Sequence, residues 1–475
     1  MIDTRTLTIE KAGEALRSGE FSSLDLVSAC LQKIKERNDE LHAFLEVFSG
    51  EKYGVDDVYA QAKRADEMIK NGKGVAMTGI PIAIKDNILM TGMITSSGSK
   101  ILENYKASYD AFVIKKLKEA GAVIMGRTNM DEFAMGSSTE NSAYGPSKNP
   151  IDPARVPGGS SGGSAVAVAS GMALGALGSD TGGSIRMPAS FCGIVGMKAT
   201  YGAVSRSGLT ALSSSLDQIG PFAKDSEDAQ IIFECISGYD EMDSTSITLK
   251  PKEKKSLKIK IGIPRDFLKE GVDAEVLKNF EETLEKLKQK GYEVVDVSMP
   301  YIKYALPVYY VILPAEVSTN LARLEGMRYG HRVEGETMFD TFKRSRSAGF
   351  GPETRRRIIL GTYVLSHGYY DAYYNKAWKV RRAIIKEYED LFKKVDYIVT
   401  PTVPMLPFKF GEKSDPVQMY LADIFTVSVN LAWLPAISIP SGFSKEGLPF
   451  GIEFTGPSES DLSLFAIEKD LRDNR

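Results

Sequence analysis

The sequence predicts an α/β fold, because apolar segments of strand length alternate with segments of helical spacing. Residues 79–85 form a nearly continuous apolar run that ends at a lysine, residues 110–120 have helical spacing, and residues 122–126 are a second apolar run. The same alternation returns at residues 259–297, where an amphipathic helix separates two apolar runs. Three further strands are predicted near the end of the chain, at residues 397–402, 436–440 and 451–455.

The other predicted elements are mostly helical. In the helical segment 1–70, Ser22 and Asp25 have the spacing of a capping box ahead of an apolar stripe. The Ala-, Val- and Leu-rich stretch 165–177 predicts a buried helix, and residues 355–392 predict another helical segment. Residues 225–345 are expected to form a peripheral α/β and helical subregion, within a chain long enough for several domains or for one large α/β domain.

Composition and charge exclude several classes of protein. The chain has 475 residues, of which 43% are hydrophobic and 25% charged, and this excludes a disordered or collagen-like protein. A net charge of −3 excludes the strongly basic surface of a stand-alone nucleic-acid binder. Three cysteines are too few for a disulfide framework. The first ten residues are charged and lack the apolar core of a secretory signal. The longest uncharged run is too polar for a membrane span. We therefore expect a cytoplasmic protein that does not enter a membrane.

Two clusters rich in glycine and serine are the strongest chemical signals, at residues 157–164 and 178–186. They could be flexible turns, a phosphate cradle, or an oxyanion hole beside a nucleophilic serine. The phosphate interpretation is weak, because neither cluster contains a Walker or dinucleotide-binding pattern. Ser161 lies within a G-x-S-x-G pattern, but Pro153 and Pro157 disfavour the central strand that a nucleophile elbow requires.

A nucleophilic serine needs a base, and none of the three histidines lies near these clusters in the sequence. Lys85 is the alternative, since its stem begins at the end of a buried strand and burial lowers the pKa of a lysine. From the strand alone, a lysine at the surface end of the strand is the favoured interpretation of Lys85.

Residues 79–87, 157–164 and 178–186 together resemble the amidase signature family in motif and in spacing. This resemblance implies one domain over residues 1–475, built on a large mixed, twisted β-sheet with helices on both faces and a peripheral α/β insertion. It also implies a cis peptide between Gly159 and Ser160, and a catalytic set of Ser184 as nucleophile, Ser160 as proton bridge and Lys85 as base. The implied oxyanion donors are the N–H groups of Thr181, Gly182, Gly183 and Ser184.

Residues 129–136, 360–374 and 419–423 resemble more narrowly the family members that hydrolyse glutamine within a tRNA-dependent amidotransferase. This resemblance implies a glutamyl ester on Ser184 and release of ammonia to a partner, the B subunit, within a heterotrimer completed by a small C subunit. The B subunit would bind most of the misacylated Glu-tRNA(Gln) and use ATP and Mg²⁺ to convert it to Gln-tRNA(Gln). No cofactor or metal is expected in this chain itself.

Glutamine carries a carboxylate and an ammonium group, so its site needs opposite charges. By resemblance, Arg357 binds the carboxylate, Asp423 pairs with the ammonium, and Tyr309 or Tyr310 lines the site, whereas Arg186 braces the nucleophile loop. Cys192 is expected to be a buried, inert thiol. Two other hypotheses remain: a free-standing amidase for another amide, which would share the catalytic residues, and a nucleotide-binding module, which would bind ATP and be indifferent to loss of Lys85.

Overall fold

The structure is a computed structural model that describes residues 2–250, 258–268, 271–413 and 415–472. Within these residues, eleven strands form one mixed sheet in the order β1-β3-β2-β4-β6-β5-β10-β11-β9-β7-β8. The strands are β1 Phe44–Val47, β2 Pro81–Lys85, β3 Val123–Thr128, β4 Gly175–Asp180, β5 Val195–Lys198, β6 Gln218–Ala223, β7 Lys260–Ile263, β8 Glu293–Asp296, β9 Tyr397–Pro401, β10 Ala436–Phe443 and β11 Pro449–Thr455.

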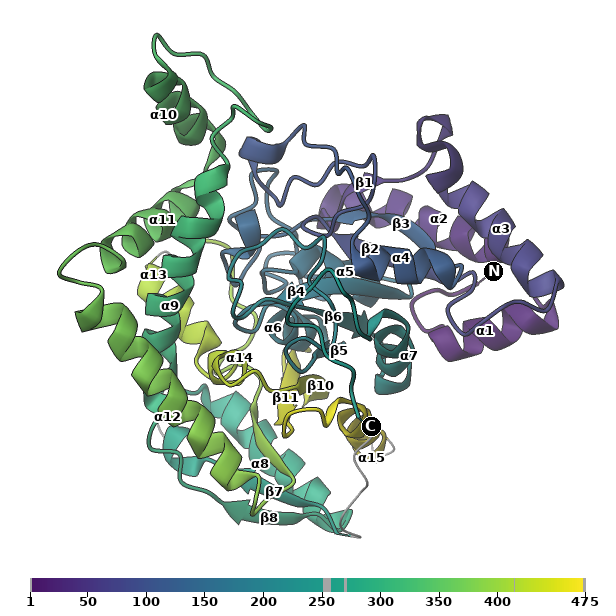
Figure 1. Cartoon of the computed structure of the whole chain (residues 1–475). Coiled ribbons are helices and arrows are strands. Elements are labelled where there is room, and N and C mark those ends of the chain that lie inside the picture. The colour runs from purple at the N-terminus through teal and green to yellow at the C-terminus, as the bar shows by residue number, and fades with distance from the viewer. Residues whose placement is uncertain (1, 251–257, 269–270, 414, 473–475) are drawn as a thin grey trace.

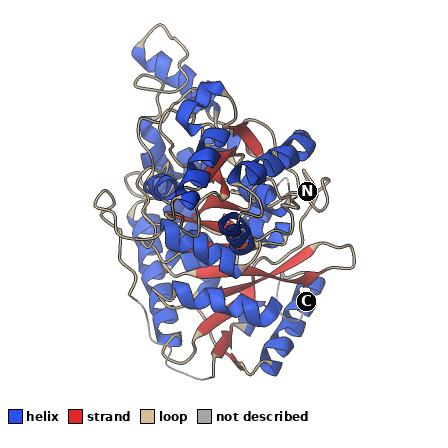
Figure 2. Ribbon diagram, turned by 90° about the vertical axis from the view of Figure 1, so that its right-hand side faces the viewer, coloured by secondary structure: helices blue, strands red, loops and turns tan. Residues whose placement is uncertain are grey.

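Helices surround this sheet, and Figure 2 shows the strands running through the molecule between them. In Figure 1, α1–α3 lie on one side of the molecule, and α9, α11 and α12 form a column on the opposite side. The helices are α1 Ile9–Ser18, α2 Ser23–Leu41, α3 Val58–Lys70, α4 Phe112–Glu119, α5 Gly162–Ala169, α6 Arg186–Cys192, α7 Ser226–Ile236, α8 Ala274–Gln289, α9 Ala305–Asn320, α10 Met338–Gly349, α11 Pro352–Val364, α12 Lys376–Leu391, α13 Pro416–Tyr420, α14 Val427–Leu431 and α15 Asp461–Arg472. The predicted α/β fold with one large mixed sheet is confirmed.

The strands that lead to the glycine- and serine-rich clusters lie side by side in this sheet. β2 runs parallel to both β3 and β4, and β4 is antiparallel to β6. Parallel neighbours end at the same edge of a sheet, so the last residues of β2 and β4 reach the same region. Lys85 closes β2 and Asp180 closes β4, directly ahead of the turn with the second serine cluster.

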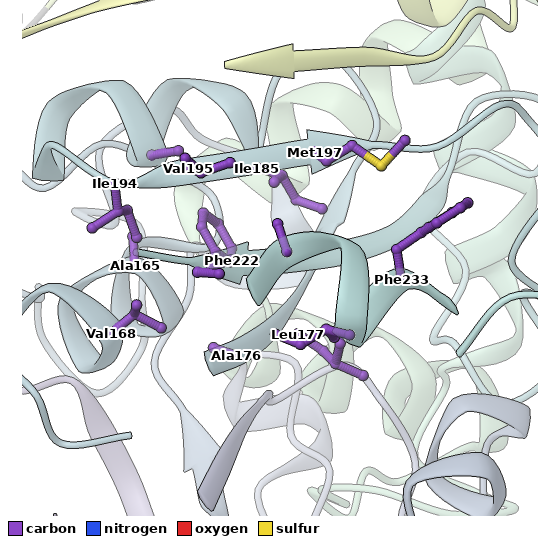
Figure 3. Close-up of a cluster of buried hydrophobic side chains, with 14 of the residues drawn as sticks. Ala165, Val168, Ala176, Leu177, Ile185, Ile194, Val195, Met197, Phe222 and Phe233 are labelled. Carbon is purple, nitrogen blue, oxygen red and sulfur yellow. The ribbon is translucent and has the colours of Figure 1, made fainter. Parts of the chain in front are cut away.

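The core around these strands is built from small and branched apolar side chains. Figure 3 shows Ala165 and Val168 of α5 together with Ala176 and Leu177 of β4, packed with Phe222 of β6. All five side chains are buried. Burial of such apolar area is the main favourable contribution to folding, and it fixes the strand ends that carry the polar site.

The predicted helix over residues 165–177 is wrong in its extent. Helix α5 begins at Gly162 and ends at Ala169, and residues from Gly175 onward form β4. Gly171 has φ of 75°, a left-handed conformation that a glycine adopts readily and that ends the helix. Nearly uniform burial hides this division, because neither the short helix nor the central strand presents a solvent-exposed polar face.

The predicted helical stretch 355–392 is divided in the same way into α11 and α12, joined by a π-helical segment at Asp371–Asn375. At the beginning of the chain, the capping box of Ser22 and Asp25 is present, but residues 1–70 also contain strand β1, which was not predicted. In the region 225–345, α7 packs on β6, and β7 and β8 extend the sheet beyond β9. Over the described ranges, no helix combines the length and apolarity needed to cross a bilayer.

Candidate active site

Lys85 lies at the centre of the site, with its side chain fully buried. Its Nζ atom lies 2.8 Å from the Ser160 hydroxyl oxygen, 2.8 Å from that of Ser161 and 3.0 Å from that of Ser179. Three hydroxyl groups therefore surround an amine that has no carboxylate within salt-bridge distance among the described residues. The structure places Lys85 in the interior rather than at the surface end of its strand.

Burial lowers the pKa of Lys85 to about 7, against the opposing effect of the carboxylates of Asp131, Asp180 and Asp217. Desolvation disfavours the charged form of an amine, and the carboxylates recover only part of that loss. An amine that titrates near neutral pH is well suited to accept a proton.

The first serine cluster presents Ser160 to Lys85. The peptide between Gly159 and Ser160 is cis, as the resemblance implies. Gly159 has no room for a side chain, because an added Cβ would lie 2.2 Å from a carboxylate oxygen of Asp131. Ser161, the serine of the elbow-like pattern, is turned inward and donates to the Ser179 carbonyl at 3.1 Å. Ser161 and Ser179 were not singled out from the sequence as partners of Lys85, although both lie within the two clusters.

Ser184 lies in the turn between β4 and α6 and is 8% exposed. Its carbonyl accepts a hydrogen bond from the Ser161 N–H at 3.2 Å, which holds the two serine clusters together. The Ser184 hydroxyl bonds to no described residue. The structure thus forms the contact between Lys85 and Ser160, whereas the contact between Ser160 and Ser184 is not formed in it.

The turn that carries Ser184 exposes several backbone N–H groups. Those of Thr181, Gly182 and Ser184 donate to no described residue. The structure differs from the expectation at Gly183, whose N–H donates to the Asp180 carboxylate at 2.8 Å. Asp180 closes β4 and also accepts from Ile185 N–H at 3.1 Å, so its carboxylate shapes this turn from inside.

Arg186 braces the turn that carries Ser184, as predicted. Its guanidinium contacts the Asp180 carboxylate at 3.0 Å, the Glu453 carboxylate at 2.8 Å and the Asn430 side-chain oxygen at 2.6 Å. The side chain is fully buried, so these partners satisfy a charge that burial alone would make unfavourable. The network ties the turn to β11 and α14.

A second group of polar side chains provides opposite charges. Arg357 on α11 is 4% exposed, and its Nε donates to Glu353 at 2.7 Å. Its two terminal nitrogens bond to no described residue and so leave the fork of the guanidinium available for a carboxylate. The Asp423 carboxylate accepts from Ser137 at 3.1 Å and from Tyr310 at 3.3 Å, and burial raises the pKa of Asp423 to about 7.

The two adjacent tyrosines connect this charged group to the turn that carries Ser184. Tyr310 lies beneath the Arg357 guanidinium, 5.3 Å from ring centre to Cζ, and stacks on Tyr420 at 4.0 Å. Tyr309 lies against the turn, since a Cβ added to Gly182 would be 2.5 Å from the Tyr309 hydroxyl oxygen. Both tyrosines therefore border the site, and Tyr420 is a contributor that the sequence did not reveal.

Cys192 is buried, and burial raises the pKa of its thiol, as expected for an inert cysteine. Of the histidines, His331 contacts Glu103 and His42 ends α2. No group of three His, Cys, Asp or Glu residues that could hold a metal occurs in the described part of the chain.

Comparison with known proteins agrees with this geometry. The family model described as Amidase matches residues 25–465. The chain is 52% identical to the A subunit of glutamyl-tRNA(Gln) amidotransferase from Thermoanaerobacter pseudethanolicus, over 95% of this chain and 93% of that protein. It is 50% identical to the A subunit of the same enzyme from Desulfatibacillum aliphaticivorans, over 98% of this chain and 95% of that protein.

Among solved structures, the A subunit of glutamyl-tRNA(Gln) amidotransferase from Thermotoga maritima superposes with a TM-score of 0.82 at 45% identity, over 100% of this chain and 96% of that one. A structure described as an amidase superposes with a TM-score of 0.82 at 30% identity, over 98% of this chain and 99% of that one. The sheet, the serine clusters, the buried lysine and these similarities agree, and the chain belongs to the amidase family.

Proposed function

We propose that this protein is the glutaminase subunit of a glutamyl-tRNA(Gln) amidotransferase. The observation that carries the proposal is the pair of opposite charges, Arg357 and Asp423, beside the turn that carries Ser184. An uncharged amide needs neither group, whereas glutamine presents a carboxylate and an ammonium at the end opposite to its reactive amide. The names of relatives about half identical over nearly the whole chain support the same substrate.

In the proposed reaction, the neutral amine of Lys85 takes a proton from Ser160 while Ser160 takes one from Ser184. This step requires the Ser184 hydroxyl to turn toward Ser160 when substrate binds. The Ser184 oxygen then attacks the side-chain carbonyl carbon of glutamine, and the free N–H groups of Thr181, Gly182 and Ser184 stabilise the oxyanion.

Collapse of the tetrahedral intermediate breaks the carbon–nitrogen bond. The proton taken from Ser184 returns through Ser160 to the departing nitrogen, so ammonia leaves and a glutamyl ester remains on Ser184. Water, deprotonated along the same path, then hydrolyses the ester, releases glutamate and restores the serine. Gly183 stays a predicted fourth oxyanion donor, and its N–H would first have to leave Asp180.

The released ammonia would pass to the B subunit, which would use ATP and Mg²⁺ to amidate Glu-tRNA(Gln), and the small C subunit would complete the heterotrimer. The names of the relatives support a multi-subunit enzyme of this kind. This chain would then need neither ATP nor extensive contact with tRNA, and its net charge of −3 agrees with little direct contact with tRNA. A tRNA substrate favours a cytoplasmic location.

The test is to incubate the full chain with glutamine, with and without the two partner proteins, and to search for the ester by mass spectrometry. The expected result is a glutamyl adduct on the peptide that contains Ser184, absent from a Ser184→Ala variant. Butyramide, which has the reactive amide but neither charged group, should be hydrolysed far less efficiently than glutamine. Equal efficiency on the two amides would favour a free-standing amidase, and an adduct on another residue would exclude the proposed nucleophile.

A further inference from the structure

The turn that follows β3 carries two adjacent carboxylates that the proposed reaction does not use. Asp131 and Glu132 are both buried, at 0% and 2% exposure. Each accepts several hydrogen bonds, and the two sets of donors belong to different parts of the site. Burying two adjacent carboxylates is unfavourable unless such bonds compensate, so their partners indicate what the turn holds in place.

Asp131 holds the segment around Ser160. Its backbone N–H donates to the Ser160 carbonyl at 3.2 Å. Its two carboxylate oxygens accept the N–H groups of Thr139 and Asn141 at 2.9 and 3.0 Å, and the Thr139 hydroxyl donates to the Gly158 carbonyl at 2.8 Å. Asp131 therefore holds the Gly158–Ser160 segment in place, directly at Ser160 and through Thr139 at Gly158.

Glu132 holds the beginning of the helix that carries Arg357. One of its oxygens accepts the Gly351 N–H at 2.8 Å and the Thr354 hydroxyl at 2.5 Å. The first residues of a helix have unpaired N–H groups, so a buried carboxylate there fixes the start of α11. A Cβ on Gly351 would lie 2.6 Å from this oxygen, which shows how closely the two segments approach.

The backbone directly after Asp131 and Glu132 is strained. Phe133 and Ala134 have φ of 48° and 59°, a left-handed conformation that is unfavourable for residues other than glycine. The Phe133 N–H donates to the Ser97 carbonyl at 2.8 Å, and its ring packs edge-on against Phe350, next to the start of α11. Strain that is held by several contacts indicates that the shape of this turn matters.

We propose that Asp131 and Glu132 are positioning residues for the amidase reaction. Asp131 sets the place of Ser160 and Glu132 sets the place of α11. Because the two residues are adjacent in the chain, they fix the separation between the reacting amide and the Arg357 guanidinium. The substrate class that follows is an amide whose carboxylate lies at a fixed distance from its reactive carbon. This inference rests on the proposed function for glutamine as the substrate.

The hydrogen bonds predict opposite results for the same chemical change at the two positions. In Asp131→Asn, the new NH₂ must face the N–H of Thr139 or of Asn141, and two donors repel. In Glu132→Gln, the carbonyl oxygen can keep Gly351 and Thr354, while the NH₂ can donate to the Ser99 hydroxyl, which now donates to Glu132. Asp131→Asn should therefore be damaging, Glu132→Gln mild, and Glu132→Ala damaging.

Two measurements on the full chain separate the two roles. The rate at which phenylmethylsulfonyl fluoride, an uncharged serine reagent, labels Ser184 reports on the nucleophile, and calorimetric glutamine affinity in a Ser184→Ala background reports on the binding end. Asp131→Asn should slow labelling about tenfold or more, the order expected when a buried hydrogen-bond set is broken. Glu132→Ala should weaken glutamine binding about tenfold or more and leave labelling within about twofold.

Asp228→Asn is the matched control. Asp228 is a fully buried carboxylate on α7 that accepts the N–H groups of Ile9 and Glu10 at 2.7 and 3.1 Å, so the same donor conflict arises at the start of α1. It should lower the melting temperature and change neither labelling nor binding. If a variant of Asp131 or Glu132 fails to fold, Thr139→Val and Thr354→Val remove one hydroxyl from the hydrogen-bond set of each carboxylate. Thr139→Val should then slow labelling, and Thr354→Val should weaken glutamine binding, each to a smaller extent.

Normal labelling in Asp131→Asn, normal glutamine binding in Glu132→Ala, or equal losses of labelling and binding in Glu132→Ala would each overturn the proposal. A wild-type chain whose Ser184 is labelled but which binds no glutamine would refute the proposed function instead. The proposed role of Glu132 in glutamine binding would then be refuted as well. The labelling rates would still test the proposed role of Asp131 in positioning Ser160.

Discussion

The titration of Lys85 should determine how the reactivity of Ser184 depends on pH. At an ordinary lysine pKa of 10.5, about 0.03% of the amines are neutral at pH 7, whereas at a pKa of about 7 about half are neutral. Burial therefore raises the concentration of usable base by roughly three orders of magnitude at pH 7. The labelling rate should rise with pH, be about a tenth of its plateau at pH 6, and level off above about pH 8.

The assay is the rate of phenylmethylsulfonyl fluoride labelling of Ser184 between about pH 5.5 and 9, corrected for spontaneous hydrolysis of the reagent. An uncharged reagent is needed because Asp423, which should affect only the binding of an ammonium group, also has a pKa of about 7. Lys85→Met should lower the rate by several orders of magnitude and remove the rise near pH 7.

Lys198 supplies the matched control for this prediction. It is 1% exposed, burial lowers its pKa to about 7, and its Nζ donates to the carbonyls of Ala199 and Leu434 rather than to a serine hydroxyl. Lys198→Met should keep the rise near pH 7. A flat profile in the wild-type chain, or a rise that survives in Lys85→Met and disappears in Lys198→Met, would refute the assignment of Lys85 as base.

Three further predictions concern the nucleophile and the charged groups. Ser184→Ala should abolish glutamate release from glutamine, measured as ammonia production. Normal ammonia production by this variant would exclude Ser184 as nucleophile. Arg357→Gln should raise the KM for glutamine at least about tenfold, since a charge-assisted hydrogen bond is lost, but leave butyramide hydrolysis nearly unchanged; equal effects in parallel kinetics would contradict the carboxylate role. Asp423 has a pKa of about 7 and pairs with an ammonium only when it is ionised, so the KM for glutamine should fall as pH rises through about 7. Asp423→Asn should remove this pH dependence. If the pH profile of KM is unchanged in the variant, another group is responsible for it.

Much of the sheet was predictable because burial leaves a local trace in the sequence. The strands at Pro81–Lys85, Val123–Thr128 and Tyr397–Pro401 lie within about two residues of the apolar runs that predicted them. The boundary between α5 and β4 was missed because all residues there except Ala169 are buried, which removes the polar alternation that separates a helix from a strand. The division into one domain with a peripheral region at residues 225–345 stays a prediction.

The catalytic set was accessible from the sequence only through a family resemblance. Spacing alone left Lys85 as an ordinary lysine at the end of a strand, and the pairing of β2 with β4 is what brings it to Ser160. Ser161 and Ser179 complete its surroundings, and no local pattern marked either serine as a partner of Lys85.

The alternating strands and helices, the two glycine-rich turns and the residue types available for acyl transfer could be predicted from the amino-acid order. They follow from side-chain polarity and backbone freedom along a short stretch of chain. Which hydrogen-bond donors already have a partner depends instead on contacts between distant parts of the fold. The Gly183 N–H is satisfied by Asp180, both Tyr309 and Tyr310 border the site, and Asp131 and Glu132 divide between Ser160 and α11. These assignments depend on the direction and distance of groups far apart in the chain, which periodicity cannot encode.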